Sequence, residues 1–243
     1  LVTRGPFIIF RKHTRERSLS ASYISRDTYM HYMNFLIPTN LQQSFITFVK
    51  ETEKRLIMLN IALFVCNSYE ENTMVINRKD SHDAIIIDPG CTEGEELDSV
   101  VSYIEKNGLK PAAILLTRAH PDHTAGVAAL QGKYGIPVYM HPLERPKDSF
   151  RSTDIEDGQV LELAGIKLKV IGTPGHTPGG VCYLDSEDKA LFSGDTLFAG
   201  TIGRTDLEGG DYDHLIVSVM DKHMGPDRTI TRYPRHAHST PIA

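Results

Sequence analysis

The 243-residue sequence has no long hydrophobic run and contains only 3 cysteines. A membrane-spanning helix needs roughly 20 consecutive apolar residues, whereas the run at 56–66 is shorter and is interrupted by Asn60. We therefore expect no membrane-spanning segment and no membrane partner. Cys66, Cys91 and Cys182 lie far apart and lack Cys-x-x-Cys spacing, so a disulfide scaffold is not expected and a reducing, cytoplasmic location fits best.

Charge divides the chain into two parts. Basic residues outnumber acidic residues in 1–57, whereas acidic residues predominate in 58–243. The basic residues of the first part are scattered among apolar ones, which argues against nucleic-acid binding. No small-residue cleavage site follows its short apolar run, so a secretory signal is not indicated, although a mitochondrial-type presequence stays open. We expect 1–57 to be a basic extension outside the core, not native if the protein begins at Met58, and 58–243 to be the functional domain.

The region after Met58 alternates short β-rich runs with turn residues, and a hydrophobic content of 40% is enough for a sizeable core. Apolar residues spaced by three and four predict helices, which we place at 93–107, 124–134 and 212–224. The pattern predicts strands at 59–66, 73–76, 84–87, 112–116, 136–140, 159–163, 166–171, 181–184 and 190–193. Two β-rich halves, each with helices, predict an α/β (α+β) fold, a four-layer αββα sandwich whose loops converge at one rim.

Metal-binding residue types follow directly after the apolar run at 112–116. His120, Asp122 and His123 supply the imidazole and carboxylate groups that hold Zn²⁺ and similar ions. Arg118 stands beside them and offers no lone pair to a metal, because its guanidinium stays protonated at ordinary pH. We expect a recognisable but incomplete metal site.

Three further loops after predicted strands carry residues of the same kind, namely His176, Asp195 and His236. One such residue in a loop is weak evidence, but joint occurrence at several strand ends favours a shared site.

With these segments, residues 58–243 resemble the metallo-β-lactamase superfamily, and within it the glyoxalase II-like (hydroxyacylglutathione hydrolase-like) hydrolases. The family motif HxHxDH corresponds to Arg118, His120, Asp122 and His123, so its first histidine is replaced. The resemblance implies one or two divalent ions, foremost Zn, with Fe or Mn as alternatives. It places the remaining ligands of a first ion on His120 and His176.

For a second ion, the resemblance implies the ligands Asp122, His123 and His236, with Asp195 between the two ions. It also implies that Asp122 acts catalytically by orienting the attacking water. The implied reaction is hydrolysis of a small-molecule thioester or related acyl ester by metal-activated water, with a hydroxyacyl-glutathione type of substrate. A β-lactam is less favoured, because the loop 197–206 resembles the thioesterase branch.

For the last ligand that the resemblance implies, His236 is preferred and His238 is the alternative. Arg235 stands where the family has a glycine that lets the backbone approach closely, which weakens the assignment of His236.

Two other functions stay open. A persulfide dioxygenase-like enzyme would use one iron at the first site, where the replaced histidine argues against it. A degenerate metal-binding protein without turnover would follow if Arg118 and Arg235 disable the site. For Arg118 itself, either the cation weakens the first site by repelling a dication, or its side chain turns away and leaves one ion at the second site. The sequence does not indicate an oligomeric state, and Asp88 is interpreted as a residue of a structural turn.

Overall fold

The computed structural model describes residues 58–144, 150–198, 200–221, 230–234, 236 and 240–241. The predictions for the extension 1–57, for Arg235 and for His238 lie outside the described residues. No helix in the described part of the chain is long and apolar enough to cross a membrane.

The first sheet has six strands in sequence order. They are β1 (Leu59–Cys66), β2 (Glu71–Arg78), β3 (Asp83–Ile87), β4 (Lys110–Leu115), β5 (Val138–Met140) and β6 (Thr153–Asp154). The first three pair antiparallel and the rest parallel. The parallel part needs crossovers, which are supplied by α3 (Glu95–Lys106), α4 (Pro121–Thr124), α5 (Val127–Tyr134) and the 3-10 helix η1 (Pro142–Glu144).

The second sheet also has six strands, in the order β14-β13-β10-β9-β8-β7. They are β7 (Val160–Leu163), β8 (Ile166–Gly172), β9 (Val181–Asp185), β10 (Ala190–Gly194), β13 (Thr231–Pro234) and β14 (Thr240–Pro241). A small hairpin, β11 (Leu197–Phe198) with β12 (Thr201–Ile202), and helix α6 (Tyr212–Asp221) join β10 to β13. β13 pairs parallel to β10.

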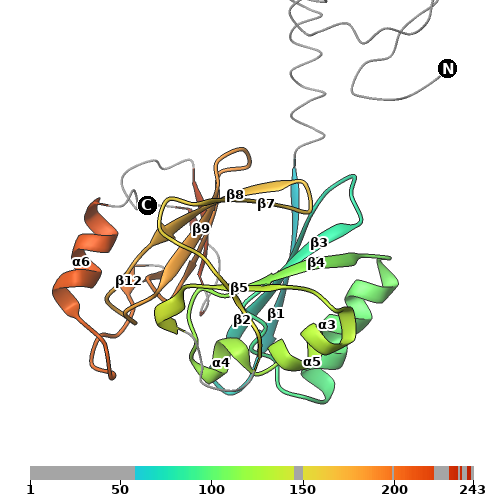
Figure 1. Ribbon diagram of the computed structural model, residues 1–243, viewed down its shortest axis with the longest axis horizontal. Helices are drawn as coiled ribbons and strands as arrows, with labels where there is room; N and C mark the ends of the chain where they lie inside the picture. Colours follow the sequence, from blue (N-terminus) through green and yellow to red (C-terminus); the bar gives the residue numbers. More distant parts are fainter. Residues whose placement is uncertain are drawn as a thin grey trace, which may run out of the picture. The chain divides into compact units, whose positions relative to one another are not determined.

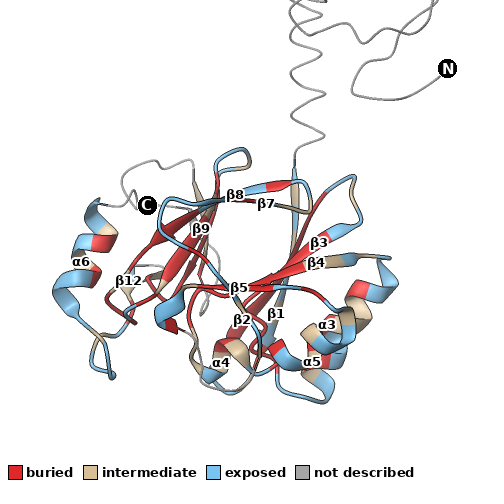
Figure 2. Ribbon diagram, in the orientation of Figure 1, coloured by how far each residue is buried: buried red, intermediate tan, exposed pale blue. Residues whose placement is uncertain are grey.

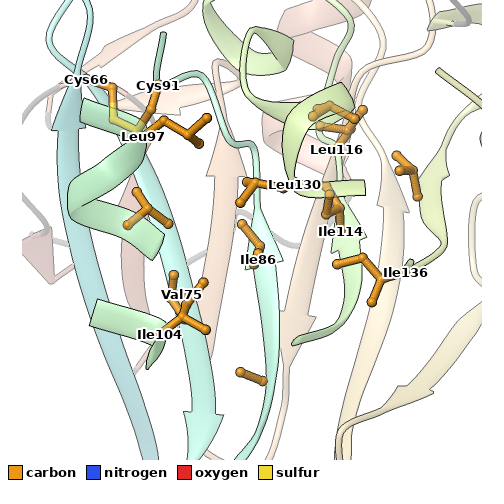
Figure 3. Packing of buried hydrophobic residues seen from close by; sticks show 14 of the residues in the cluster. Cys66, Val75, Ile86, Cys91, Leu97, Ile104, Ile114, Leu116, Leu130 and Ile136 are labelled. Atoms are coloured by element: carbon orange, nitrogen blue, oxygen red, sulfur yellow. A yellow bond between two sulfur atoms is a disulfide. The ribbon is translucent and has the colours of Figure 1, made fainter. Parts of the chain in front are cut away.

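Three apolar clusters define four layers. Side chains alternate along β3, so Ile86 packs against the cluster that includes Val100 of α3, whereas Ile85 and Ile87 pack between the two sheets. Figure 3 shows the first cluster, and Figure 2 shows that buried residues predominate in the strands. Val219 of α6 packs on a third cluster on the second sheet. The predicted αββα sandwich is therefore confirmed, with α3 and α5 beside one sheet and α6 beside the other (Figure 1).

The helix predicted at 124–134 starts too early, because Thr124 ends a separate short helix, α4, and α5 begins only at Val127. The backbone N–H of Gly126 donates to the carbonyl of Pro89, and a Cβ at this glycine would lie 3.0 Å from the carbonyl oxygen of Cys91. The loop after β3 therefore packs directly on the chain between the two helices. That loop is remote in sequence, so local periodicity did not reveal the division.

Cys66 and Cys91 form a disulfide, and Cys182 is free and buried (Figure 3). The sequence prediction of separate thiols is wrong for this pair. Although 25 residues separate them, the order β1-β2-β3 places the end of β1 near the loop that follows β3. The cysteine spacing therefore no longer argues for a reducing compartment.

Candidate metal centre

Four segments bring the predicted site residues to one rim of the sandwich. The segments after β4, β8, β10 and β13 carry His123, His176, Asp195 and His236, respectively. The two sheets are joined here, because the hydroxyl of Tyr183 donates to the carbonyl of Leu116 over 2.7 Å. The rim is thus a point at which side chains from both sheets can converge.

Gly194 allows the segment after β10 to approach the first motif closely. Its φ angle is +52°, and a Cβ built there would lie 2.5 Å from the Oγ1 of Thr117. A side chain at position 194 would therefore be strained and would collide with Thr117. The glycine lets the next residue, Asp195, lie against the motif that contains Asp122 and His123.

The four side chains of Asp122, His123, Asp195 and His236 form a candidate metal-binding cluster. Each offers one ligand atom, and these atoms all lie within 4.8 Å of one another. The Nε2 atom of His236 is 3.6 Å from both the Oδ2 of Asp122 and the Oδ1 of Asp195. The structure thus brings together the residues that the resemblance assigned to a second ion and to the position between two ions.

Backbone carbonyls orient two of the histidines. The Nδ1 of His236 is 2.7 Å from the carbonyl oxygen of Tyr69, and the Nδ1 of His176 is 2.6 Å from that of Arg204. A carbonyl oxygen only accepts hydrogen bonds, so Nδ1 carries the proton in each ring and Nε2 keeps its lone pair when the ring is neutral. This is the tautomer that a metal-binding histidine needs.

Asp88 performs the same task for His123, a role that was not predicted from the sequence. Its carboxylate accepts hydrogen bonds from the backbone N–H and the hydroxyl of Thr117, both over 2.6 Å, and its Oδ2 is 3.3 Å from the Nδ1 of His123. Asp88 is fully buried. Its position directly after β3 matched the strand-end pattern of the other site residues, and that pattern was a usable signal.

Glu144 was also missed. Its two carboxylate oxygens accept hydrogen bonds from the N–H groups of Ala119 and Gly179, each over 2.9 Å. The buried side chain thereby connects the first motif with the loop that carries His176. A glutamate in a short 3-10 helix carries no motif, so no sequence signal identified it.

Arg118 points into the cluster and is 5% exposed. Its Nε donates to the Nε2 of His123 over 2.6 Å, and its Nη2 lies 2.9 Å from the Oδ2 of Asp122 and 2.5 Å from the Oδ2 of Asp195. The side chain therefore does not turn away from the site, which was one of the two arrangements expected from the sequence. A fixed positive charge lies between the carboxylate of Asp195, which is buried, and that of Asp122, which is partly buried.

The charges in the cluster shift its pKa values. Burial raises the pKa of Asp122, but hydrogen bonding to His236 and the charge of Arg118 outweigh it and lower that pKa from 3.8 to about 2. Burial likewise opposes ionisation of Asp195, whose pKa is held well below its usual range by His123 and Arg118. Burial and the charge of Arg118 lower the pKa of His176, which favours the neutral ring that can bind a metal.

The residues present fit a divalent ion. Two buried atoms of the site, the Nε2 of His176 and the Oδ1 of Asp195, have no hydrogen-bond partner. Buried polar atoms are usually paired, and imidazole and carboxylate together suit Zn, Fe and Mn. His120, the other predicted ligand of a first ion, lies with its ring 5.3 Å from that of His176 but is not in the four-residue cluster.

Comparison with known proteins agrees with this arrangement of strands. The sequence profile of the Metallo-beta-lactamase superfamily matches residues 69–233. The chain belongs to this superfamily. As a metallo-β-lactamase superfamily member it carries a His/Asp cluster capable of binding a metal ion, although the assignment of each ligand is still a prediction.

Relatives of this superfamily member include an uncharacterized protein of Mycobacterium tuberculosis, which is 33% identical over 74% of this chain and 89% of the relative. Hydroxyacylglutathione hydrolase GloC of Haemophilus influenzae is 31% identical over 68% of this chain and 84% of its own length. Two crystal structures are each 31% identical to the chain. The match to BLEG-1 B3 metallo-beta-lactamase has a TM-score of 0.66 and covers 76% of this chain and 94% of the other. The match to TTHA1623 in a di-iron-bound form has a TM-score of 0.64 and covers 74% of this chain and 94% of the other.

Proposed function

We propose that this metallo-β-lactamase superfamily protein is a metal-dependent hydrolase that cleaves a small-molecule thioester, of the hydroxyacyl-glutathione type. The observation that carries the proposal is the convergence of Asp122, His123, Asp195 and His236 within 4.8 Å. Water adds across the bond between acyl carbon and sulfur and yields a carboxylic acid and a thiol. We propose one ion at this cluster, with Zn foremost and Fe or Mn as alternatives.

The protein residues have distinct parts in this reaction. A divalent ion bound here would lower the pKa of a coordinated water to about 7 and polarise the acyl carbonyl. Asp122 stays ionised down to about pH 2, so its carboxylate can accept a hydrogen bond from the water and orient it. His236 is the most exposed of the four ligand candidates, with 26% of its side chain accessible, and Phe198 lies beside its ring at 6.1 Å. We propose that an acyl group approaches from this exposed side, past these two rings.

The thioester substrate is supported by two observations. One relative of known name is a hydroxyacylglutathione hydrolase, and the loop at 197–206 resembles the thioesterase branch. A β-lactam is the competing substrate, since one structural relative is a B3 metallo-beta-lactamase. Both are acyl compounds open to attack by the same water, so substrate choice depends on the residues around the cluster.

The test is thiol release from a hydroxyacyl-glutathione thioester by protein loaded separately with Zn, Fe or Mn. We expect turnover that requires metal and that falls at least 100-fold in Asp122→Asn, the order of effect for a group that positions the reacting water. Hydrolysis of a β-lactam but not of the thioester would overturn the substrate assignment. Oxygen uptake with glutathione persulfide by the iron-loaded protein would instead indicate a dioxygenase, and no turnover on any substrate would indicate a degenerate site.

A further inference from the structure

We propose that Arg118 is an internal cation that occupies the metal site of the metal-free protein and competes with a divalent ion for His123. The inference rests on the metal site of the proposed function, but it does not depend on the substrate. Before an ion binds, Arg118 holds the cluster together.

The Nε2 of His123 has a single lone pair, which either Arg118 or a metal ion can use. Asp88 lies on the Nδ1 side of the ring, so Nε2 is the nitrogen that faces the cluster. Arg118 donates its Nε–H to that nitrogen over 2.6 Å. An aromatic ring nitrogen has one lone pair, which cannot accept this hydrogen bond and coordinate an ion at the same time. The guanidinium and a metal at His123 therefore exclude each other.

The carboxylates of Asp122 and Asp195 carry negative charge that a cation must balance. Asp122 and Asp195 have side chains that are 15% and 7% exposed, and the Nη2 of Arg118 is within 2.9 Å of an oxygen of each. Two ionised carboxylates close together at a largely buried site are unfavourable without a neutralising cation. Arg118 supplies that cation, so the cluster stays assembled in the absence of a metal ion.

Hydrogen bonds hold the backbone on both sides of Arg118. The N–H of Thr117 donates to Asp88, and the N–H of Ala119 donates to Glu144. The adjacent cavity, lined by Thr173, Thr177 and other residues, has room for about one water molecule. Because the backbone is held on both sides, binding of an ion at His123 requires rotation of the arginine side chain out of the cluster.

The experiment compares Zn²⁺ affinity in the full chain, by competition with a chromophoric chelator, among wild type, Arg118→Ala and Arg118→Gln. Without the guanidinium the lone pair of His123 is free, so both variants should bind Zn²⁺ at least about tenfold more tightly, equivalent to ~1.4 kcal/mol. Lys167→Gln is the matched control, because Lys167 is a surface cation paired only with Glu162 among described residues. It should leave the affinity unchanged.

The second readout is thermal unfolding in chelator and in excess Zn²⁺. The variants should melt about 5 °C or more below wild type in chelator, since their carboxylates have lost the neighbouring guanidinium, and should recover most of this loss with Zn²⁺. Wild type should respond less. If a variant does not fold in chelator, refolding it with Zn²⁺ and measuring affinity afterwards still decides the question.

Equal Zn²⁺ affinity in wild type and both variants would overturn the proposal, as would weaker binding in the variants. A purely structural Arg118 would give variants that are destabilised with and without Zn²⁺ and that gain no affinity. Thioester turnover is measured separately. A competition that is present without turnover would leave Arg118 as proposed and would contradict only the proposed function.

Discussion

The Nε of Arg118 lies 2.6 Å from the Nε2 of His123, the nitrogen that would otherwise face a metal ion. In the motif that the resemblance supplies, a histidine stands at the position of this arginine. The guanidinium instead donates to the lone pair of His123, a member of the four-residue cluster. We therefore expect Arg118 to affect metal binding at this cluster as well as at the first predicted ion.

Arg118→His should restore the missing imidazole and remove the competing charge at once. We expect the variant to hold close to two ions per chain and wild type one or fewer, measured by elemental analysis after loading and gel filtration. Lys167→His, purified in parallel, adds a histidine on the surface and should match wild type. Two ions in wild type as well would mean that Arg118 does not limit metal binding.

Asp88→Asn should weaken metal binding by about 10- to 100-fold, the usual effect of losing a carboxylate that orients a metal-binding histidine. The carboxylate accepts from Thr117 and lies 3.3 Å from the Nδ1 of His123, and an amide can donate where the carboxylate only accepts. Zn²⁺ affinity by chelator competition measures the change. Asp206→Asn, at an exposed carboxylate paired with Arg204, is the control and should bind as wild type does.

Acid should destabilise the metal-free protein through Asp122. Its folded pKa is lowered from 3.8 to about 2, so its contribution is present above pH 3.8 and is lost as the pH falls toward about 2. In chelator, the unfolding free energy of both proteins should fall as the pH falls through this window. We expect the decrease for Asp122→Asn to be about 1–2 kcal/mol smaller than that for wild type. Urea unfolding at several pH values measures it.

Asp206 serves as the comparison for that pH experiment. Its pKa is also lowered to about 2, by hydrogen bonding to Arg204, but the carboxylate is fully exposed. Solvent and salt screen such a pair, so Asp206→Asn should leave the acid dependence of stability close to that of wild type. An identical acid profile for Asp122→Asn and wild type would contradict the assignment to Asp122.

Glu144→Ala should lower stability by about 2–4 kcal/mol, because two backbone N–H groups, of Ala119 and Gly179, lose their acceptor. The melting temperature should fall by roughly 5–10 °C. Glu162→Ala removes an exposed glutamate that pairs with Lys167 and should change little. A melting temperature within about 1 °C of wild type for Glu144→Ala would show that the two loops hold their positions without this carboxylate.

Gly90→Ala should disrupt the site by displacing the backbone at Asp122. A Cβ at Gly90 would lie 1.6 Å from the carbonyl oxygen of Asp122, so the backbone of the first motif would have to move. We expect loss of Zn²⁺ binding and a lower melting temperature. Gly132→Ala, in the interior of α5 with open space around it, should instead be neutral or stabilise by about 0.5–1 kcal/mol. Equal behaviour of the two variants would contradict the close approach at Gly90.

The periodicity of apolar residues was sufficient to predict most of the fold. Alternation along β3 and the three- and four-residue spacing of Leu97, Val100 and Ile104 reflect which faces are buried, so the layered sandwich follows from local sequence. The division of the helix around Gly126 was not predictable. It depends on a hydrogen bond to Pro89, which the fold brings close.

The sequence by itself determined the superfamily and the residue types of the site, because metal-binding side chains after strands form a pattern along the chain. Only the tertiary structure decided the direction of Arg118, the roles of Asp88 and Glu144, and the Cys66–Cys91 disulfide. The reason is physical. Each of these features is a contact whose energy depends on the distance and orientation of two groups. The packing of strands and loops sets both quantities, and the order of residues along the chain does not specify them.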